Sequence, residues 1–251
     1  MGYINLRGHQ VWSNEFANKG EPLLSLHGGL SASHRWDFTI LPAVEHDHHI
    51  YSYDRSGHCR TGIRPGFYHF NFQTEEAIAY IEDVIKQPTH MIGHSDGAII
   101  ALMVAFNRPD LVKSVVSIGA NYHWDAGFPS DAFSGEIIIS EEDAAEFAEF
   151  SPDHPDTQVG IIKKAMDVWQ NEPTMTKTDL AKIQCPVLVM AGEVEPFSNH
   201  HTVDLYESIT DADLAIVPGA SHSVTKDKPA LALAIIKDFY AGLSIRGLEE
   251  S

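Results

Sequence analysis

Apolar residues along this chain form short, dense runs that alternate with longer stretches in which they recur every three or four positions. The short runs are rich in Val, Ile, Leu and Tyr and end at glycine, proline or polar residues, which is typical of buried strands. The pattern predicts strands over residues 3–6, 9–13, 23–26, 49–53, 90–92, 112–118, 186–192 and 214–217.

Helical spacing occupies most of the intervals between these runs. Over residues 75–87, Ala77, Ile81 and Ile85 share one face of a helix that Thr74 can cap. Further helices are expected near residues 98–107, 141–150, 156–171, 199–209 and 228–243. Because strands and helices alternate, we expect an α/β fold with a parallel sheet covered on both faces.

The alternation stops between residues 121 and 180. This segment holds a loop with proline and glycine, an acidic helix, and a break at 151–155 before a second helix. We therefore expect a core domain built from residues 1–120 and 181–251, with residues 121–180 as a helical insertion. After residue 243 the sequence favours a mobile tail.

The 251 residues include 17 Lys and Arg against 35 Asp and Glu, a formal net charge of -18. Such a chain repels nucleic-acid phosphates and anionic membranes, so neither is an expected partner. The two cysteines, Cys59 and Cys185, provide no disulfide framework. The N-terminus lacks a signal peptide's apolar run, and no segment offers about 18 consecutive apolar residues. We expect a cytoplasmic protein.

Residues 46–49 (His-Asp-His-His) invite a metal assignment. Consecutive side chains at the start of a strand point to opposite faces, so they do not converge on one ion. No metal site is expected here.

Residues 93–97 read Gly-His-Ser-Asp-Gly between an apolar run and a helical pattern. A serine on a sharp strand-to-helix turn adopts strained backbone angles, so the residues two before and two after it must lack clashing side chains. The turn also places Ser95 at a helix N-terminus, where the N–H of Asp96 can stabilise negative charge on a substrate oxygen. This pattern predicts a nucleophile, with an ordinary glycine-bounded turn as the alternative.

A second backbone donor can come from the loop after residues 23–26, where His27 precedes two adjacent glycines. Glycines after a buried strand let backbone N–H groups face a ligand, and Gly29 is the expected donor. A plain strand-ending turn is the alternative here.

Five motifs in this order resemble the α/β-hydrolase superfamily over essentially the whole chain. They are residues 27–29 (His-Gly-Gly), 54–58 (Asp-Arg-Ser-Gly-His), 93–97, 192–195 (Gly-Glu-Val-Glu) and 219–222 (Gly-Ala-Ser-His). The resemblance implies a doubly wound, mostly parallel eight-stranded sheet with helices on both faces and a small helical cap.

The resemblance also implies a catalytic triad in the order serine, acid, histidine. Ser95 is then the nucleophile and His222 the general base. The acid is expected three residues after the glycine that ends the preceding strand, where this chain has Glu195 in place of the usual aspartate. Glu193 is the alternative acid. The N–H groups of Gly29 and Asp96 would form the oxyanion hole.

A serine hydrolase of this kind cleaves a small-molecule carboxylic ester through an acyl-enzyme and needs neither cofactor nor metal. The turn at residues 93–97 is also similar to that of the valacyclovir-hydrolase, or biphenyl-hydrolase-like, branch, in which the aspartate at the position of Asp96 is associated with a substrate α-amino group. Amino-acid esters are therefore candidate substrates beside simple short-chain esters. The expected pocket residues are Leu30, Asp96, Trp124, Phe128, Met166 and Trp169.

Two other functions stay open. A carbon–carbon bond hydrolase of dienoates from aromatic-ring cleavage resembles this scaffold, and its acidic substrates require basic residues such as Lys163, Lys164 and Lys177. A ligand receptor that keeps the fold and the triad would bind tightly and turn over almost stoichiometrically. The sequence leaves the oligomeric state open, a homo-oligomer included.

Overall fold

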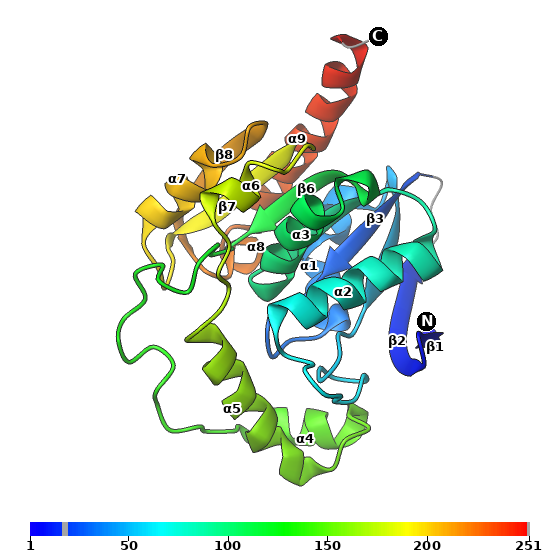
Figure 1. The fold of residues 1–251 in the computed structure, drawn as a ribbon, viewed down its shortest axis with the longest axis vertical. Helices are drawn as coiled ribbons and strands as arrows, with labels where there is room; N and C mark the ends of the chain where they lie inside the picture. Colours follow the sequence, from blue (N-terminus) through cyan, green and yellow to red (C-terminus); the bar gives the residue numbers. More distant parts are fainter. Residues whose placement is uncertain (17–19, 250–251) are drawn as a thin grey trace.

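The computed structural model describes residues 1–16 and 20–249 and centres on one eight-stranded sheet (Figure 1). Its strands are β1 (Gly2–Leu6), β2 (His9–Phe16), β3 (Glu21–Leu26), β4 (His48–Tyr53), β5 (Thr89–His94), β6 (Val112–Ile118), β7 (Val187–Val194) and β8 (Ala212–Ser221). They lie in the order β1-β2-β4-β3-β5-β6-β7-β8. The pairs β1–β2 and β2–β4 are antiparallel and the other pairs are parallel. The predicted α/β class with a mostly parallel sheet is confirmed.

Helices connect and cover these strands. Their bounds are α1 (Ser33–Val44), α2 (Phe70–Tyr80), α3 (Asp96–Asn107), α4 (Glu141–Phe150), α5 (Gln158–Trp169), α6 (Lys177–Leu180), α7 (Asn199–Glu207), α8 (Val224–Asp227) and α9 (Pro229–Glu249). The strand and helix starts predicted from apolar periodicity agree with most of these bounds to within a few residues.

Two apolar clusters, one on each face of the sheet, form the core. Successive residues of a strand point to opposite faces, so sequence neighbours belong to different clusters. Leu23 and Ile92 pack with α1 and α9, whereas Leu24 and Met91 pack with α2 and α3. Because both faces are covered, the central strands carry buried apolar residues on both sides.

Helix α2 begins at Phe70, so the predicted cap at Thr74 is wrong, and Thr74 is buried inside the helix. The first backbone donor is satisfied from a distant part of the chain. The carboxylate of Glu172 accepts the N–H of Phe70 at 2.9 Å. A cap supplied by tertiary structure leaves no local signal in the sequence.

Helix α9 continues to Glu249, where the sequence favoured a tail after residue 243. No proline follows Pro229, so every later residue keeps the backbone donor that a helix needs. The last turns of α9 extend beyond the rest of the molecule in Figure 1. Residues 250 and 251, also assigned to the tail, lie outside the described part. Within that part no helix, α9 included, combines the length and apolar character needed to cross a membrane.

Helices α4 and α5 lie together at one end of the molecule, beyond the edge of the sheet (Figure 1). Helix α5 buries Ile161, Ala165 and Val168, whereas α4 buries none of its residues. The assignment of residues 121–180 as a separate insertion stays a prediction.

The turn between β5 and α3 brings main-chain atoms into direct contact. A Cβ on Gly93 would lie 2.3 Å from the carbonyl carbon of Gly97. A Cβ on Gly97 would lie 2.2 Å from the carbonyl oxygen of Leu26 in β3. Since these neighbours are backbone atoms, they can move only if a strand or a helix moves with them. Glycine is therefore required on both sides of Ser95.

We expect Gly97→Ala to lower the free energy of unfolding by about 1–3 kcal/mol or more, because overpacking against fixed atoms costs this much. Gly160→Ala in α5 is the matched control, since a Cβ there meets nothing within 4 Å. It removes a glycine from a helix and should raise the free energy of unfolding by about 0.5–1 kcal/mol. Urea unfolding followed by circular dichroism measures both. A Gly97→Ala protein as stable as wild type would contradict the steric argument.

Candidate active site

Ser95 lies in the turn between β5 and α3, at the carboxyl end of the central strands. Its φ of 54° and ψ of −120° are strained for a residue with a side chain. Its N–H donates to the carbonyl oxygen of Ile118 at 2.8 Å, which ties the turn to β6. Asp96 is the first residue of α3, so its N–H has no acceptor within the helix. The turn thus presents a hydroxyl and a backbone donor side by side.

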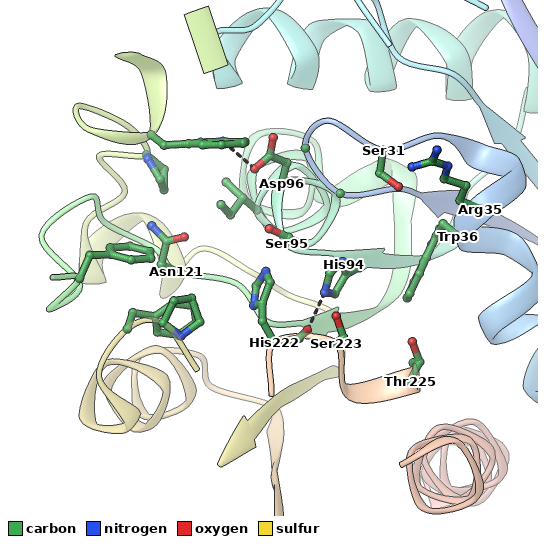
Figure 2. A pocket seen from close by; sticks show the side chains of 18 of the residues that line it. Ser31, Arg35, Trp36, His94, Ser95, Asp96, Asn121, His222, Ser223 and Thr225 are labelled. Atoms are coloured by element: carbon green, nitrogen blue, oxygen red, sulfur yellow. Dashed lines mark hydrogen bonds between the residues drawn. The ribbon is translucent and has the colours of Figure 1, made fainter. Parts of the chain in front are cut away.

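His222 follows β8 and is bonded to Glu195, which follows β7. Nδ1 of His222 donates to Oε2 of Glu195 at 2.5 Å, and the Glu195 side chain is fully buried. The other carboxylate oxygen accepts the N–H of Gly192 at 2.9 Å. With Nδ1 as the donor, Nε2 of the neutral ring can accept a proton. Figure 2 shows His222 and Ser95 facing the same space.

Glu193, the alternative acid, is held elsewhere. Its carboxylate accepts the N–H of Gly219 at 2.8 Å. The pairing of β7 with β8 shifts register between Gly192 and Val194, so the two glutamates take different directions. Of the two, Glu195 is the one that the structure places on His222.

The pair of His222 and Glu195 lies over Gly119, at the end of β6. Gly119 has a φ of 66°. A Cβ there would lie 2.9 Å from Cε1 of His222 and 3.5 Å from Oε1 of Glu195. The missing side chain leaves room for the imidazole.

His94 fixes the backbone of His222. Its Nε2 donates to the carbonyl oxygen of His222 at 2.8 Å, and its ring stacks on Trp36 with centroids 5.5 Å apart (Figure 2). Burial, with a smaller effect of the neighbouring His222, lowers the pKa of His94 to about 4. The ring is therefore neutral near pH 7 and keeps one donor for this bond.

Gly28 and Gly29 follow β3 and face the turn after β5. The buried guanidinium of Arg55 donates to the carbonyl oxygen of Gly28 at 2.8 Å, which fixes the loop. A Cβ on Gly29 would lie 2.5 Å from Oδ2 of Asp96 and 2.5 Å from Cζ2 of Trp169. Only glycine fits between these groups without moving them.

The Asp96 side chain is only 2% exposed and contributes to a cavity wall (Figure 2). Its Oδ1 accepts the indole N–H of Trp169 at 3.0 Å. Its Oδ2 is buried and has no hydrogen-bond partner among the described residues. Burial raises the pKa of this carboxyl, because the ion loses hydration there. An unpaired buried carboxylate oxygen is a site for a donor or a cation.

One cavity of about 370 Å³ has Ser95, Asp96 and His222 in its wall. This volume falls within the range of small-molecule sites. Of the pocket residues predicted from the sequence, Phe128 and Trp169 line it as well. The structure therefore brings the predicted nucleophile, base and part of the predicted pocket to one place.

Sequence reasoning missed several residues of this wall, including Trp36, Asn121, Phe133 and Phe197. Asn121 and Phe197 come just after β6 and β7, so the convergence of parallel strand ends could have indicated them. Trp36 and Phe133 carry no comparable signal. They reach the cavity only through the packing of α1 and of the loop before α4.

Leu30 and Met166, also predicted pocket residues, line a second cavity of about 390 Å³ beside the first. We call it the apolar chamber, after the apolar side chains in its wall, which include Leu30, Ile137, Ile138, Phe147, Ile161, Ile162 and Met166. Trp124 lines neither cavity, and it is 44% exposed.

In the described part of the chain, one group of side chains has the spacing of metal ligands. It consists of His34, Cys59 and Glu146, whose potential ligand atoms lie within 4.8 Å of one another. A cation already lies there, since Nη1 of Arg60 is 3.2 Å from Nδ1 of His34 and 3.6 Å from Sγ of Cys59. Burial raises the pKa of the Cys59 thiol to about 12, which disfavours the thiolate that binds metals. The group is better explained as a guanidinium site.

The family model described as "Alpha/beta hydrolase family" matches residues 23–234, which include all the site residues described above. A relative from Pseudomonas savastanoi pv. phaseolicola, named "Putative carbamate hydrolase RutD", is 32% identical over 112 residues. That match covers 44% of this chain and 42% of the relative, less than half of either. An "AB hydrolase superfamily protein" of Gibberella zeae is 29% identical over 241 residues, covering 87% of this chain and 79% of the relative.

Solved structures share the fold. One from a study of carboxylesterases of the thaumarchaeon Nitrososphaera gargenis has a TM-score of 0.77 at 18% identity. The superposition covers 97% of this chain and 99% of that chain. At this identity the similarity concerns the fold alone.

We expect Trp169→Phe to lower the free energy of unfolding by about 1–3 kcal/mol, because it removes the side-chain donor that the buried Asp96 carboxyl has among the described residues. Trp124→Phe, which alters an exposed ring, is the matched control and should change little. Urea unfolding monitored by circular dichroism compares the two variants. Equal stabilities would show that the indole contact contributes nothing.

Proposed function

Because the chain belongs to the alpha/beta hydrolase family, we propose that it is a serine hydrolase that cleaves carboxylic esters of small substrates. One observation carries the proposal. Ser95 stands on a strained turn in the wall of the cavity that also exposes His222, and Nδ1 of His222 is bonded to the buried Glu195. A nucleophile, a base and an orienting acid are the groups that acyl transfer needs.

In the proposed reaction, Oγ of Ser95 attacks the ester carbonyl carbon while Nε2 of His222 takes the hydroxyl proton. The carbonyl oxygen becomes an oxyanion that accepts hydrogen bonds from the N–H groups of Gly29 and Asp96. The carbon–oxygen bond of the ester then breaks, and His222 returns the proton to the departing alcohol. A water that gives its proton to Nε2 of His222 then attacks the acyl carbon. The bond from this carbon to Oγ of Ser95 breaks, His222 returns the proton to Oγ, and the carboxylic acid leaves.

Asp96 favours neutral or cationic esters over acidic dienoates, although Arg35 and Lys226 bring positive charge to the wall of the nucleophile cavity. The lysines expected for an acidic substrate are engaged away from the cavity, since Lys164 pairs with Asp167 and Lys177 with Asp204. Lys163 lines a separate surface groove. The carboxyl of Asp96 beside the nucleophile would also repel an anionic substrate once ionised.

Amino-acid esters are a more specific candidate substrate class, because Oδ2 of Asp96 has no partner among the described residues. An ammonium group there would supply the missing donor and a compensating charge. Carbamates form a second class for the substrate panel, because a carbamate presents a similar carbonyl to Ser95 and relatives bear the name carbamate hydrolase.

Ser95→Ala is expected to abolish hydrolysis of p-nitrophenyl butyrate while leaving the circular dichroism spectrum unchanged. Glu195→Gln should lower kcat by about 10⁴-fold, the loss seen when a triad acid becomes its amide. Glu193→Gln, whose carboxylate binds the N–H of Gly219, is the matched control and should keep kcat near the wild-type value. Stopped-flow and steady-state assays measure these rates.

Near-normal turnover by Ser95→Ala would rule out the serine mechanism. A larger loss in Glu193→Gln than in Glu195→Gln would reverse the choice of acid. Tight ester binding with at most one turnover per protein would favour the receptor instead.

Asp96→Asn should raise KM for valine ethyl ester by about 10- to 150-fold, because this is the loss of affinity expected when one charged hydrogen bond is removed. The neutral isovaleric ethyl ester, which has no amine, is the matched substrate and should change little. Since burial raises the pKa of Asp96, the carboxylate forms only as pH rises through that elevated pKa. The preference of the wild type for the amino ester should therefore grow with pH and decline once the amine deprotonates, near pH 7–8.

This pH dependence should vanish in Asp96→Asn. If both esters lose activity equally in the variant, the carboxylate acts on the fold or the turn and does not bind an amine.

A further inference from the structure

We infer that the apolar chamber binds a hydrocarbon chain of the substrate whose ester carbonyl lies at Ser95. The inference rests on the proposed ester hydrolysis and adds a substrate class, esters with a medium-length alkyl chain. Neither the family match nor the nucleophile assigns a role to this cavity.

Apolar side chains from several segments line the chamber, beside polar and charged ones. Leu30 lies in the loop after β3, Ile138 in the loop before α4, Phe147 in α4, and Ile162 in α5. Apolar surface that faces water is unfavourable, and an alkyl chain would cover it. At about 390 Å³ the chamber suits a chain of several methylenes rather than a macromolecule.

The chamber adjoins the cavity of Ser95. Ser31 and Arg35 line both, and in Figure 2 they lie on the opposite side of Ser95 from Asn121. Helix α5 also borders both spaces, because Met166 lines the chamber and Trp169, one turn later, lines the nucleophile cavity. A chain attached to a carbonyl at Ser95 therefore has a short path past Ser31.

Leu30 stands at the junction and follows Gly29, the proposed oxyanion donor. Its φ of 49° lies in the left-handed region, which is unusual for a branched residue. The hydroxyl of Tyr68 accepts its N–H at 3.1 Å and helps to hold this conformation. Strain that the surroundings maintain next to a site is typical of functional positions. Here it directs an apolar side chain into the chamber.

The charged side chains in the wall of the chamber are mostly acidic. Arg35 is bonded to Glu146 and lies 3.7 Å from Asp143, both in α4. With Glu136, the lining carries three acidic side chains against one arginine, a net formal charge of −2. These acidic groups would repel an anionic ligand such as a free fatty acid, whereas they would not repel a neutral ester. The observations thus favour a neutral hydrocarbon over an anion or a peptide.

The test compares p-nitrophenyl esters from acetate to dodecanoate. In the wild type we expect kcat/KM to rise about fourfold per methylene until the chamber is filled. This factor corresponds to the free energy gained by burying one CH₂ group. Ile162→Trp fills the chamber and should lower the ratio of decanoate to acetate activity at least tenfold. Ile137→Trp repeats the test from a loop if the first variant unfolds. Val159→Trp, on the same helix but outside the chamber and 42% exposed, should leave the profile unchanged.

A second measurement does not depend on turnover. Calorimetric titration with decan-1-ol should show binding to wild type and Val159→Trp and at least tenfold weaker binding to Ile162→Trp. Equal binding by all three proteins, or a flat chain-length profile with active acetate hydrolysis, would overturn the chamber assignment. Failure of the proposed ester hydrolysis would give a different result from failure of the chamber assignment. In that case no ester, acetate included, would show Ser95-dependent turnover.

Discussion

The site depends on the contact between main chains at the start of α3. Gly97 lies directly against the carbonyl oxygen of Leu26, and Gly93 against Gly97, so no side chain can enter between β3, β5 and α3. This packing holds Ser95 at a positive φ that an isolated serine would avoid. The cost of that strain is met by the buried sheet around it, where Met91 and Ile92 are fully covered. A rigid core therefore presents a strained nucleophile candidate.

Parallel strands explain why distant residues meet at Ser95. Their carboxyl ends lie at one edge of the sheet, so the loops after β3, β5, β6, β7 and β8 converge there. Gly29, Gly119, Glu195 and His222 arrive by this route. Each loop is held by contacts of its own, such as the bond from Arg55 to the loop after β3. The arrangement of the site residues is thus fixed by separate contacts in each loop.

The wall away from the strand ends has a different physical character. Helix α4 buries no residue and meets α1 through the pairs of Arg35 with Glu146 and Asp143. Exposed ion pairs of this kind contribute about 0–1 kcal/mol each. One wall of the apolar chamber is therefore formed by a partly exposed helix whose Phe147 packs against the core, while the nucleophile rests on the core itself. A substrate chain in the chamber would add apolar contacts to this helix.

The sequence by itself determined the α/β alternation, the glycines around Ser95 and the order of the candidate groups, because these depend on spacing along one segment. Tertiary structure decided which way individual side chains point and which distant segments they contact. A register shift in β7 separated Glu195 from Glu193, and neighbouring segments placed Trp169 and Met166 in different cavities. The start of α2 was set by Glu172, far away in the chain. Such contacts follow from how elements pack, and no local pattern encodes them.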